Sequence, residues 1–120
     1  MYRVLALAVA GPLVATVRFH RVEVRVSQEK RNAIAKYLSD NMSGLQIEQK
    51  HDFDRGAQTF KVHAVDGSRL LKVSDEFISD NDILDILRRF DQWKLTDTLL
   101  REKQLGILAT ENGLETFDRD

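Results

Sequence analysis

The chain contains no cysteine among its 120 residues. Disulfide bonds, thiolate nucleophiles and cysteine-ligated zinc or iron–sulfur centres are therefore excluded. The absence is typical of a reducing compartment, so we expect a cytoplasmic protein. Proline occurs once, at position 12, and the six glycines are dispersed. No proline-rich or glycine-rich linker therefore divides the chain.

The sequence also lacks the short motifs that identify several enzyme classes. It contains no glycine-rich phosphate loop, no HExxH, no GxSxG and no EF-hand loop. We therefore expect a non-catalytic protein that uses no cofactor and no metal ion.

Neither strong charge nor a long apolar run is present. The net charge is −1, which predicts no bulk attraction to nucleic acid or to an anionic membrane. The segment from Val4 to Val17 is almost wholly apolar, but it is shorter than the roughly 20 residues that a membrane-spanning helix needs. Read as a signal peptide, its Ala8-Val9-Ala10 triplet comes too early. We expect no membrane association.

The composition, with 42% hydrophobic and 31% charged residues, is that of one globular domain. We divide the chain into an apolar N-terminal segment (1–21), a single α+β domain (22–117) and a frayed tail (118–120). The N-terminal segment is expected to be an edge strand or an appendage, because Pro12 would interrupt a central strand. A mature chain that begins near Val22 would keep every other predicted element.

Alternation of apolar and charged residues predicts a strand within Thr16–Val26. Ser27 is a good N-cap for a helix over 28–42, which Gly44 would end. Leu45 to Val73 then predicts three antiparallel strands.

The Asp66-Gly67 dipeptide suits a type I′ turn, which would place Val62 opposite Leu71. The turn before it needs an even length to put Ile47 on the face of Val62. Gln49 and His51 would then share that face, where apolar residues are expected.

The segment from Ser74 to Gln104 is predicted to be helical. Its first apolar stripe would be capped by Asp80 or Asn81, and a second short helix by Thr96. Asn112-Gly113 predicts a final hairpin with Leu108 opposite Phe117.

The predicted fold is a two-layer α+β domain, in which an antiparallel β-meander sheet packs against helices. The expected core joins strand residues to helix residues: Ile47, Phe60, Val62, Leu71 and Val73 with Tyr37, Leu38, Ile83, Ile86, Leu87 and Phe90.

One polar cluster combines residue types used in metal sites and hydrolases: His51, Asp52, Asp54 and His63. A small metal-dependent hydrolase around His51 would need these side chains to converge. The simpler interpretation is structural, because Asp54 can accept backbone amides in a turn.

A second candidate surface consists of Trp93, Arg88, Arg89 and Lys94, a stacking ring among basic side chains that could bind nucleic acid. The order of helix, three strands and helix resembles that of double-stranded-RNA-binding domains. Where that family carries a basic cluster, however, this chain has Ser74-Asp75-Glu76. Neighbouring acids favour helix-surface ion pairs instead.

The first hypothesis for function is a non-catalytic protein-interaction module that binds a protein partner or itself as a homodimer. Its contact would be a sheet edge or the N-terminal segment. Nucleic-acid binding through the Trp93 surface and hydrolysis around His51 are the two alternatives.

Overall fold

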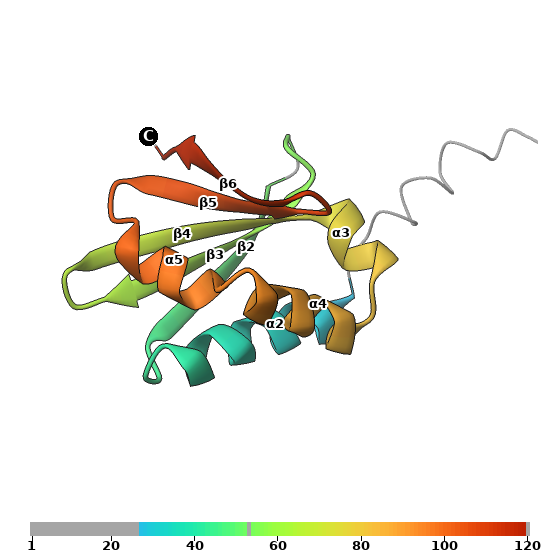
Figure 1. The fold of residues 1–120 in the computed structure, drawn as a ribbon, viewed down its shortest axis with the longest axis horizontal. Helices are drawn as coiled ribbons and strands as arrows, with labels where there is room; N and C mark the ends of the chain where they lie inside the picture. Colours follow the sequence, from blue (N-terminus) through green and yellow to red (C-terminus); the bar gives the residue numbers. More distant parts are fainter. Residues whose placement is uncertain (1–26, 53, 120) are drawn as a thin grey trace, which may run out of the picture.

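The computed structural model describes residues 27–52 and 54–119 (Figure 1). Its elements in chain order are α2 (Gln28–Asn41), β2 (Gln46–Asp52), β3 (Ala57–Ala64), β4 (Gly67–Ser74), α3 (Asp75–Asp80), α4 (Ile83–Gln92), α5 (Leu95–Arg101), β5 (Leu105–Thr110) and β6 (Gly113–Asp118). The two-layer α+β fold that the sequence predicts is confirmed for this part of the chain. The segment 1–26, including the strand expected within Thr16–Val26, lies outside the described residues.

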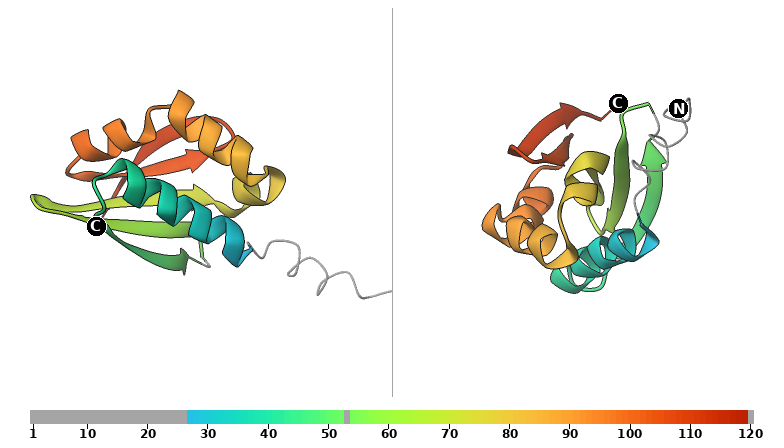
Figure 2. Two further views of the ribbon diagram at one scale, coloured as in Figure 1. Left: turned by 90° about the horizontal axis from the view of Figure 1, so that it is seen from below. Right: turned by 90° about the vertical axis from the view of Figure 1, so that its right-hand side faces the viewer.

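The sheet has five strands in the order β2-β3-β4-β5-β6, and the helices lie on one of its faces (Figure 2). β2, β3 and β4 form the predicted antiparallel meander, and β5 and β6 form a hairpin. β4 and β5 are parallel, so the sheet is mixed. A parallel pair needs a crossover connection, and α3, α4 and α5 supply it across the helical face.

Helix α2 begins and ends close to where its sequence predicts. The hydroxyl of Ser27 accepts a hydrogen bond from the backbone N–H of Lys30 at 3.1 Å, as expected of an N-cap. After the helix, Ser43 and Gly44 both have positive φ, and the Gly44 N–H donates to the Ser39 carbonyl. This turn reverses the chain into β2.

The helix caps in the crossover differ from the prediction. Asp82, rather than Asp80 or Asn81, caps α4 by accepting from the backbone N–H of Asp85 at 2.9 Å. The residue before α5 is Lys94 in a left-handed conformation, and Thr96 lies inside the helix. No side chain therefore caps the start of α5. The residue types in this segment could not indicate that arrangement.

The turn between β2 and β3 places the residues of β2 on the faces that the sequence predicts. Ile47 pairs with Val62, Gln49 with Phe60 and His51 with Gln58. Ile47, Gln49 and His51 therefore all lie on the helical face of the sheet, as predicted.

The predicted registers of both glycine hairpins are wrong by two residues. Val62 lies opposite Arg69 rather than Leu71, and Leu108 lies opposite Glu115 rather than Phe117. A type I′ turn needs positive φ at both central residues. Among the described residues other than glycine, positive φ occurs only at Ser43 and Lys94.

The turns instead use the two residues before each glycine, and the glycine opens the next strand. Gly67 has φ +127° and Gly113 has φ +112°, values that favour glycine at the first strand position. Because side chains alternate with a period of two, the shift changes each cross-strand partner but leaves every side chain on its predicted face.

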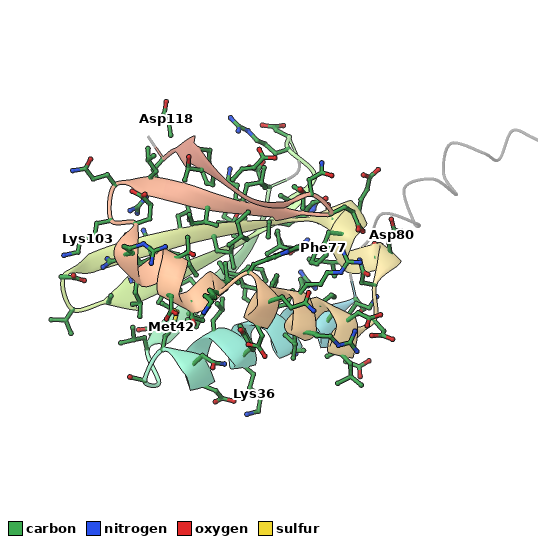
Figure 3. The ribbon with its side chains drawn as sticks, in the orientation of Figure 1. Lys36, Met42, Phe77, Asp80, Lys103 and Asp118 are labelled. Atoms are coloured by element: carbon green, nitrogen blue, oxygen red, sulfur yellow. The ribbon has the colours of Figure 1, made fainter. Side chains whose placement is uncertain are left out.

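The core lies between the sheet and the helices (Figure 3). Of the predicted members, the fully buried ones are Leu38, Phe60, Val62, Leu71, Val73, Ile86 and Phe90. Ile47, Tyr37 and Leu87 pack at its margin. Phe77 and Ile78 of α3 are also completely buried. The sequence did not single them out, because α3 is too short to show a helical stripe.

One charged side chain lies inside this core. Arg69 of β4 is 2% exposed, and its guanidinium donates to the carbonyls of Leu99, Leu100 and Gly67 at 3.0, 3.2 and 2.9 Å. It also pairs with Asp66 at 2.9 Å. Arg69 therefore ties the end of α5 to the sheet by satisfying carbonyls that a helix end leaves without partners.

Two residues of the C-terminal tail, Asp118 and Arg119, are described by the structure. Asp118 is the last residue of β6. The Arg119 guanidinium donates to the carbonyl and hydroxyl of Ser68 at 3.0 and 2.8 Å. The end of β6 is therefore fastened across the sheet to the start of β4.

Candidate interaction surface

The face of the sheet opposite the helices, here called the outer face, has no described helix over it (Figure 2). The strand registers align one residue from each strand in a row across it: Lys50, Thr59, Lys72, Leu108 and Glu115. When helices cover only one face of a sheet, the other face is normally polar. This row mixes cationic, polar, apolar and acidic side chains.

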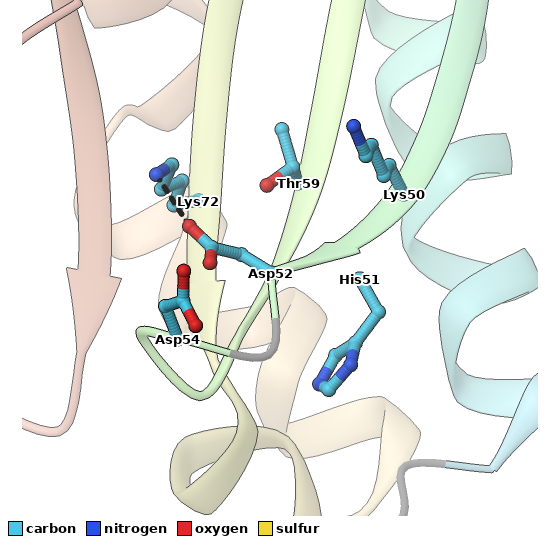
Figure 4. A pocket seen from close by; sticks show the side chains of 6 residues that line it. All are labelled: Lys50, His51, Asp52, Asp54, Thr59 and Lys72. Atoms are coloured by element: carbon cyan, nitrogen blue, oxygen red, sulfur yellow. Dashed lines mark hydrogen bonds and ion pairs between the residues drawn. The ribbon is translucent and has the colours of Figure 1, made fainter.

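A polar depression of about 500 Å³ occupies the β2 side of the outer face (Figure 4). Lys50, Asp52, Asp54, Thr59 and Lys72 line it, together with His51. Within it the Lys72 ammonium pairs with the Asp52 carboxylate at 2.8 Å. This hydrogen bond is the main cause that lowers the pKa of Asp52 below its usual value.

A smaller depression of about 230 Å³ lies on the other side of Lys72 and is more apolar in character. Its lining includes Ala57, Leu108 and Phe117. The Phe117 ring covers Gly106, where an added Cβ would come within 2.2 Å of a ring carbon. The Lys72 ammonium lies 5.2 Å from the centre of the same ring. Lys72 thus separates a polar from an apolar hollow.

Charged side chains without a described partner flank these hollows. Lys50 and Lys61, on β2 and β3, are exposed and form no ion pair with any residue that the structure describes. The same holds for Glu115 on β6, at the opposite side of the face. Half-buried Leu70 lies between them on β4. Among the described residues, the outer face therefore has unpaired lysines toward β2, an unpaired glutamate on β6 and partly apolar side chains between them.

Three residues of the predicted polar cluster line the polar depression, His51, Asp52 and Asp54, whereas His63 is not part of its lining. The His51 ring points away from Asp52 (Figure 4) and lies on the helical face, where its Nε2 is 2.8 Å from an oxygen of Asp75. Asp54 lies exposed in the turn. His63 is near the other end of β3 and pairs with Glu48 at 2.7 Å. His63 is thus separated from the other three residues, and the His51 ring turns toward Asp75.

His51 belongs instead to a polar cluster that the sequence did not reveal. The Asp75 carboxylate, only 6% exposed, contacts His51 through one oxygen and accepts from the Gln58 amide at 3.2 Å through the other. The backbone N–H of Asp75 donates to the Gly56 carbonyl. These contacts join the first turn of α3 to the β2–β3 end of the sheet. The sequence contained one signal of a buried partner: His51 falls on the face of β2 where apolar residues are expected.

Three of the four side chains of the predicted Trp93 surface already have contacts. The Trp93 ring is half-buried, with its centre 5.7 Å from that of Phe77. Arg88 pairs with Asp85 at 2.7 Å, and Arg89 pairs with Glu111 at 3.2 Å. Lys94 is exposed at the turn before α5. Each arginine thus has a carboxylate beside it.

The described residues also bear on other site types. No group of three or more histidine, aspartate or glutamate side chains there is arranged to hold a metal ion. No helix in the described part of the chain is long and apolar enough to cross a membrane.

No protein family, curated protein or solved structure matches the chain.

Proposed function

We propose that this chain is a non-catalytic interaction domain that self-associates through the outer face of its sheet. The observation that carries the proposal is that, among residues 27–52 and 54–119, the helices lie on one face of the sheet and leave the other without a helix over it. That other face holds half-buried Leu70, Leu108 and Phe117 between charges of opposite sign that form no ion pair with a described residue.

The charge arrangement favours a second copy as the partner. A two-fold axis brings the same patch of both subunits together, so that one side of the patch meets the opposite side of its copy. With an axis that runs parallel to the strands near the middle of the sheet, Lys50 and Lys61 of one copy approach Glu115 of the other. The net charge of −1 adds almost no overall repulsion.

The area of the outer face sets the expected strength of self-association. Five strands about 4.8 Å apart and about 20 Å long present about 500 Å² on each copy. Two copies would then bury about 1,000 Å², the lower limit for a specific interface. We therefore expect a reversible dimer with a dissociation constant in the micromolar range.

Light scattering after size-exclusion chromatography tests this on the full chain. The measured mass should rise from 13.8 kDa toward twice that value as the loading concentration increases. Leu108→Glu places a charge in the apolar hollow and should weaken association at least tenfold. Leu84→Glu makes the same change on α4, at a leucine 73% exposed on the helical layer, and should leave association unchanged.

The proposal fails if the unmodified chain keeps the monomer mass at every concentration, or if Leu108→Glu associates as well as Leu84→Glu. Circular dichroism checks that both variants fold. Should Leu108→Glu unfold, Lys61→Glu replaces it, because Lys61 is exposed and the reversal of its charge would repel Glu115 of the other copy.

A further inference from the structure

The apolar hollow of the outer face has two ends of different chemistry. Its complete lining is Arg55, Ala57, Lys72, Ser74, Leu108, Thr110 and Phe117. Lys72 of β4 and Leu108 of β5 are paired near its middle. Ser74 and Thr110, the last residues of the same two strands, lie at one end, beside the turn that carries Arg55. The ring of β6 lies toward the other end.

We propose that this hollow binds a small carboxylic acid with an apolar body. The carboxylate would lie at the Arg55 end, and the body would lie against Phe117. The proposal goes beyond self-association, although both use part of the outer face. Three features support it: the donors at one end, the apolar surface along the rest and the position of the acids around the hollow.

Three donor groups without an acceptor among the described residues line the polar end. The Arg55 guanidinium is exposed and forms no ion pair or hydrogen bond with a described residue. The Ser74 hydroxyl accepts from the backbone N–H of Phe77 at 3.4 Å, and the Thr110 hydroxyl accepts from that of Asn112 at 3.1 Å. Each hydroxyl therefore still has its own proton to donate. A carboxylate can accept from all three groups, and it matches the planar fork of a guanidinium.

The rest of the hollow offers apolar surface for the body of the acid. The Phe117 ring lies over Gly106, and half-buried Leu108 follows two residues later on β5. Ala57, which is 2% exposed, completes the apolar part of the lining. The four residues of strand from Gly106 to Thr110 span about 13 Å. This length and the volume of about 230 Å³ suit a single ring or a branched chain on a short linker.

No acid among the described residues lines this hollow. Asp52 and Asp54 line the polar hollow instead, and the Asp52 carboxylate already pairs with the Lys72 ammonium at 2.8 Å. Glu115 lies on β6 beside the middle of the apolar hollow. It would repel an anion there, whereas Arg55 would attract one at the polar end. These charges therefore favour one orientation of the acid, with its carboxylate at Arg55.

A titration with phenylacetate tests the proposal on the full chain, at a protein concentration for which light scattering gives the monomer mass. The amide NMR signals of Ser74, Leu108 and Thr110 in nitrogen-labelled protein should shift and saturate in the millimolar range, as expected of a ligand with so few atoms. Phenylacetamide keeps the ring without the charge, and acetate keeps the charge without the ring. Each should bind at least fivefold more weakly than phenylacetate.

Arg55→Gln should weaken the binding of phenylacetate at least fivefold and leave that of phenylacetamide unchanged, because only the charged pair is lost. The matched control, Arg101→Gln, changes an exposed arginine on α5 and should alter neither. The proposal is overturned if the signals do not shift, if Arg55→Gln binds phenylacetate as tightly as the unmodified chain does, or if phenylacetamide or acetate binds equally well. Since binding is measured on the monomer, its failure would leave self-association standing, and a chain that never associates could still bind the acid.

Discussion

Removal of the guanidinium of Arg69 should destabilise the fold more than any other single polar change. Arg69→Met keeps an unbranched side chain of similar length but removes every donor. The carbonyls of Leu99, Leu100 and Gly67 would lose charged hydrogen bonds of 3.0, 3.2 and 2.9 Å. A buried carbonyl left without a partner costs about 1–3 kcal/mol. Since Leu100 and Gly67 are exposed enough for water to replace part of the loss, we expect a total of about 3–5 kcal/mol.

The ion pair of Arg69 with Asp66 should contribute much less. The Asp66 side chain is 50% exposed, so water can replace the arginine and the pair stabilises the fold only weakly. Asp66→Asn is therefore the matched control for Arg69→Met. Urea denaturation followed by circular dichroism measures both. The reasoning is refuted if Arg69→Met lowers the free energy of unfolding no more than Asp66→Asn does.

Three further changes test other contacts. Gly106→Ala would place a Cβ 2.2 Å from the Phe117 ring and should lower the free energy of unfolding by about 1–3 kcal/mol through overpacking. Urea denaturation should show a smaller loss in a Phe117→Ala background, because that change removes the ring. Asp75→Ala removes the carboxylate that joins α3 to the sheet and should cost about 2–3 kcal/mol, whereas an equally stable variant would show that the cluster contributes nothing. The Lys72 hydrogen bond lowers the pKa of Asp52, so its stabilisation is complete above about pH 4 and is lost as pH falls through the lowered pKa. The melting temperatures of the unmodified chain and Asp52→Asn should accordingly differ most near neutral pH and converge in acid.

Periodicity predicts the parts of this fold in which many residues share one preference. The meander, α2 and the buried side chains of β3 and β4 all follow from alternation or from a helical stripe. The predicted face of each side chain was therefore correct along these elements. The hairpin registers were not, because register depends on which two residues form each turn. Gly67 and Gly113 use their positive φ in the strand rather than in the turn, and composition alone does not separate these arrangements.

The candidate surface was harder to predict than the core. Lys72, which divides the two hollows, meets Leu108 only because β4 and β5 pair in parallel across a helical crossover. Such long-range pairing leaves no local signal in the sequence. Conversely, the ring of His51 turns away from Asp52 because alternate strand residues point to opposite faces. His51 and Asp52 are neighbours in the chain and lie on opposite sides of the sheet.

The parallel pairing of β4 with β5 also has a consequence for how the chain folds. The meander brings together residues that are close in sequence, such as Ala64 and Gly67. Leu71 and Ile107, in contrast, meet only after the whole helical crossover has closed between them. Closing a longer loop costs more chain entropy, and non-local contacts slow folding. We therefore expect β2–β4 and the β5–β6 hairpin to form early and separately, with their docking through α3–α5 as the rate-limiting step.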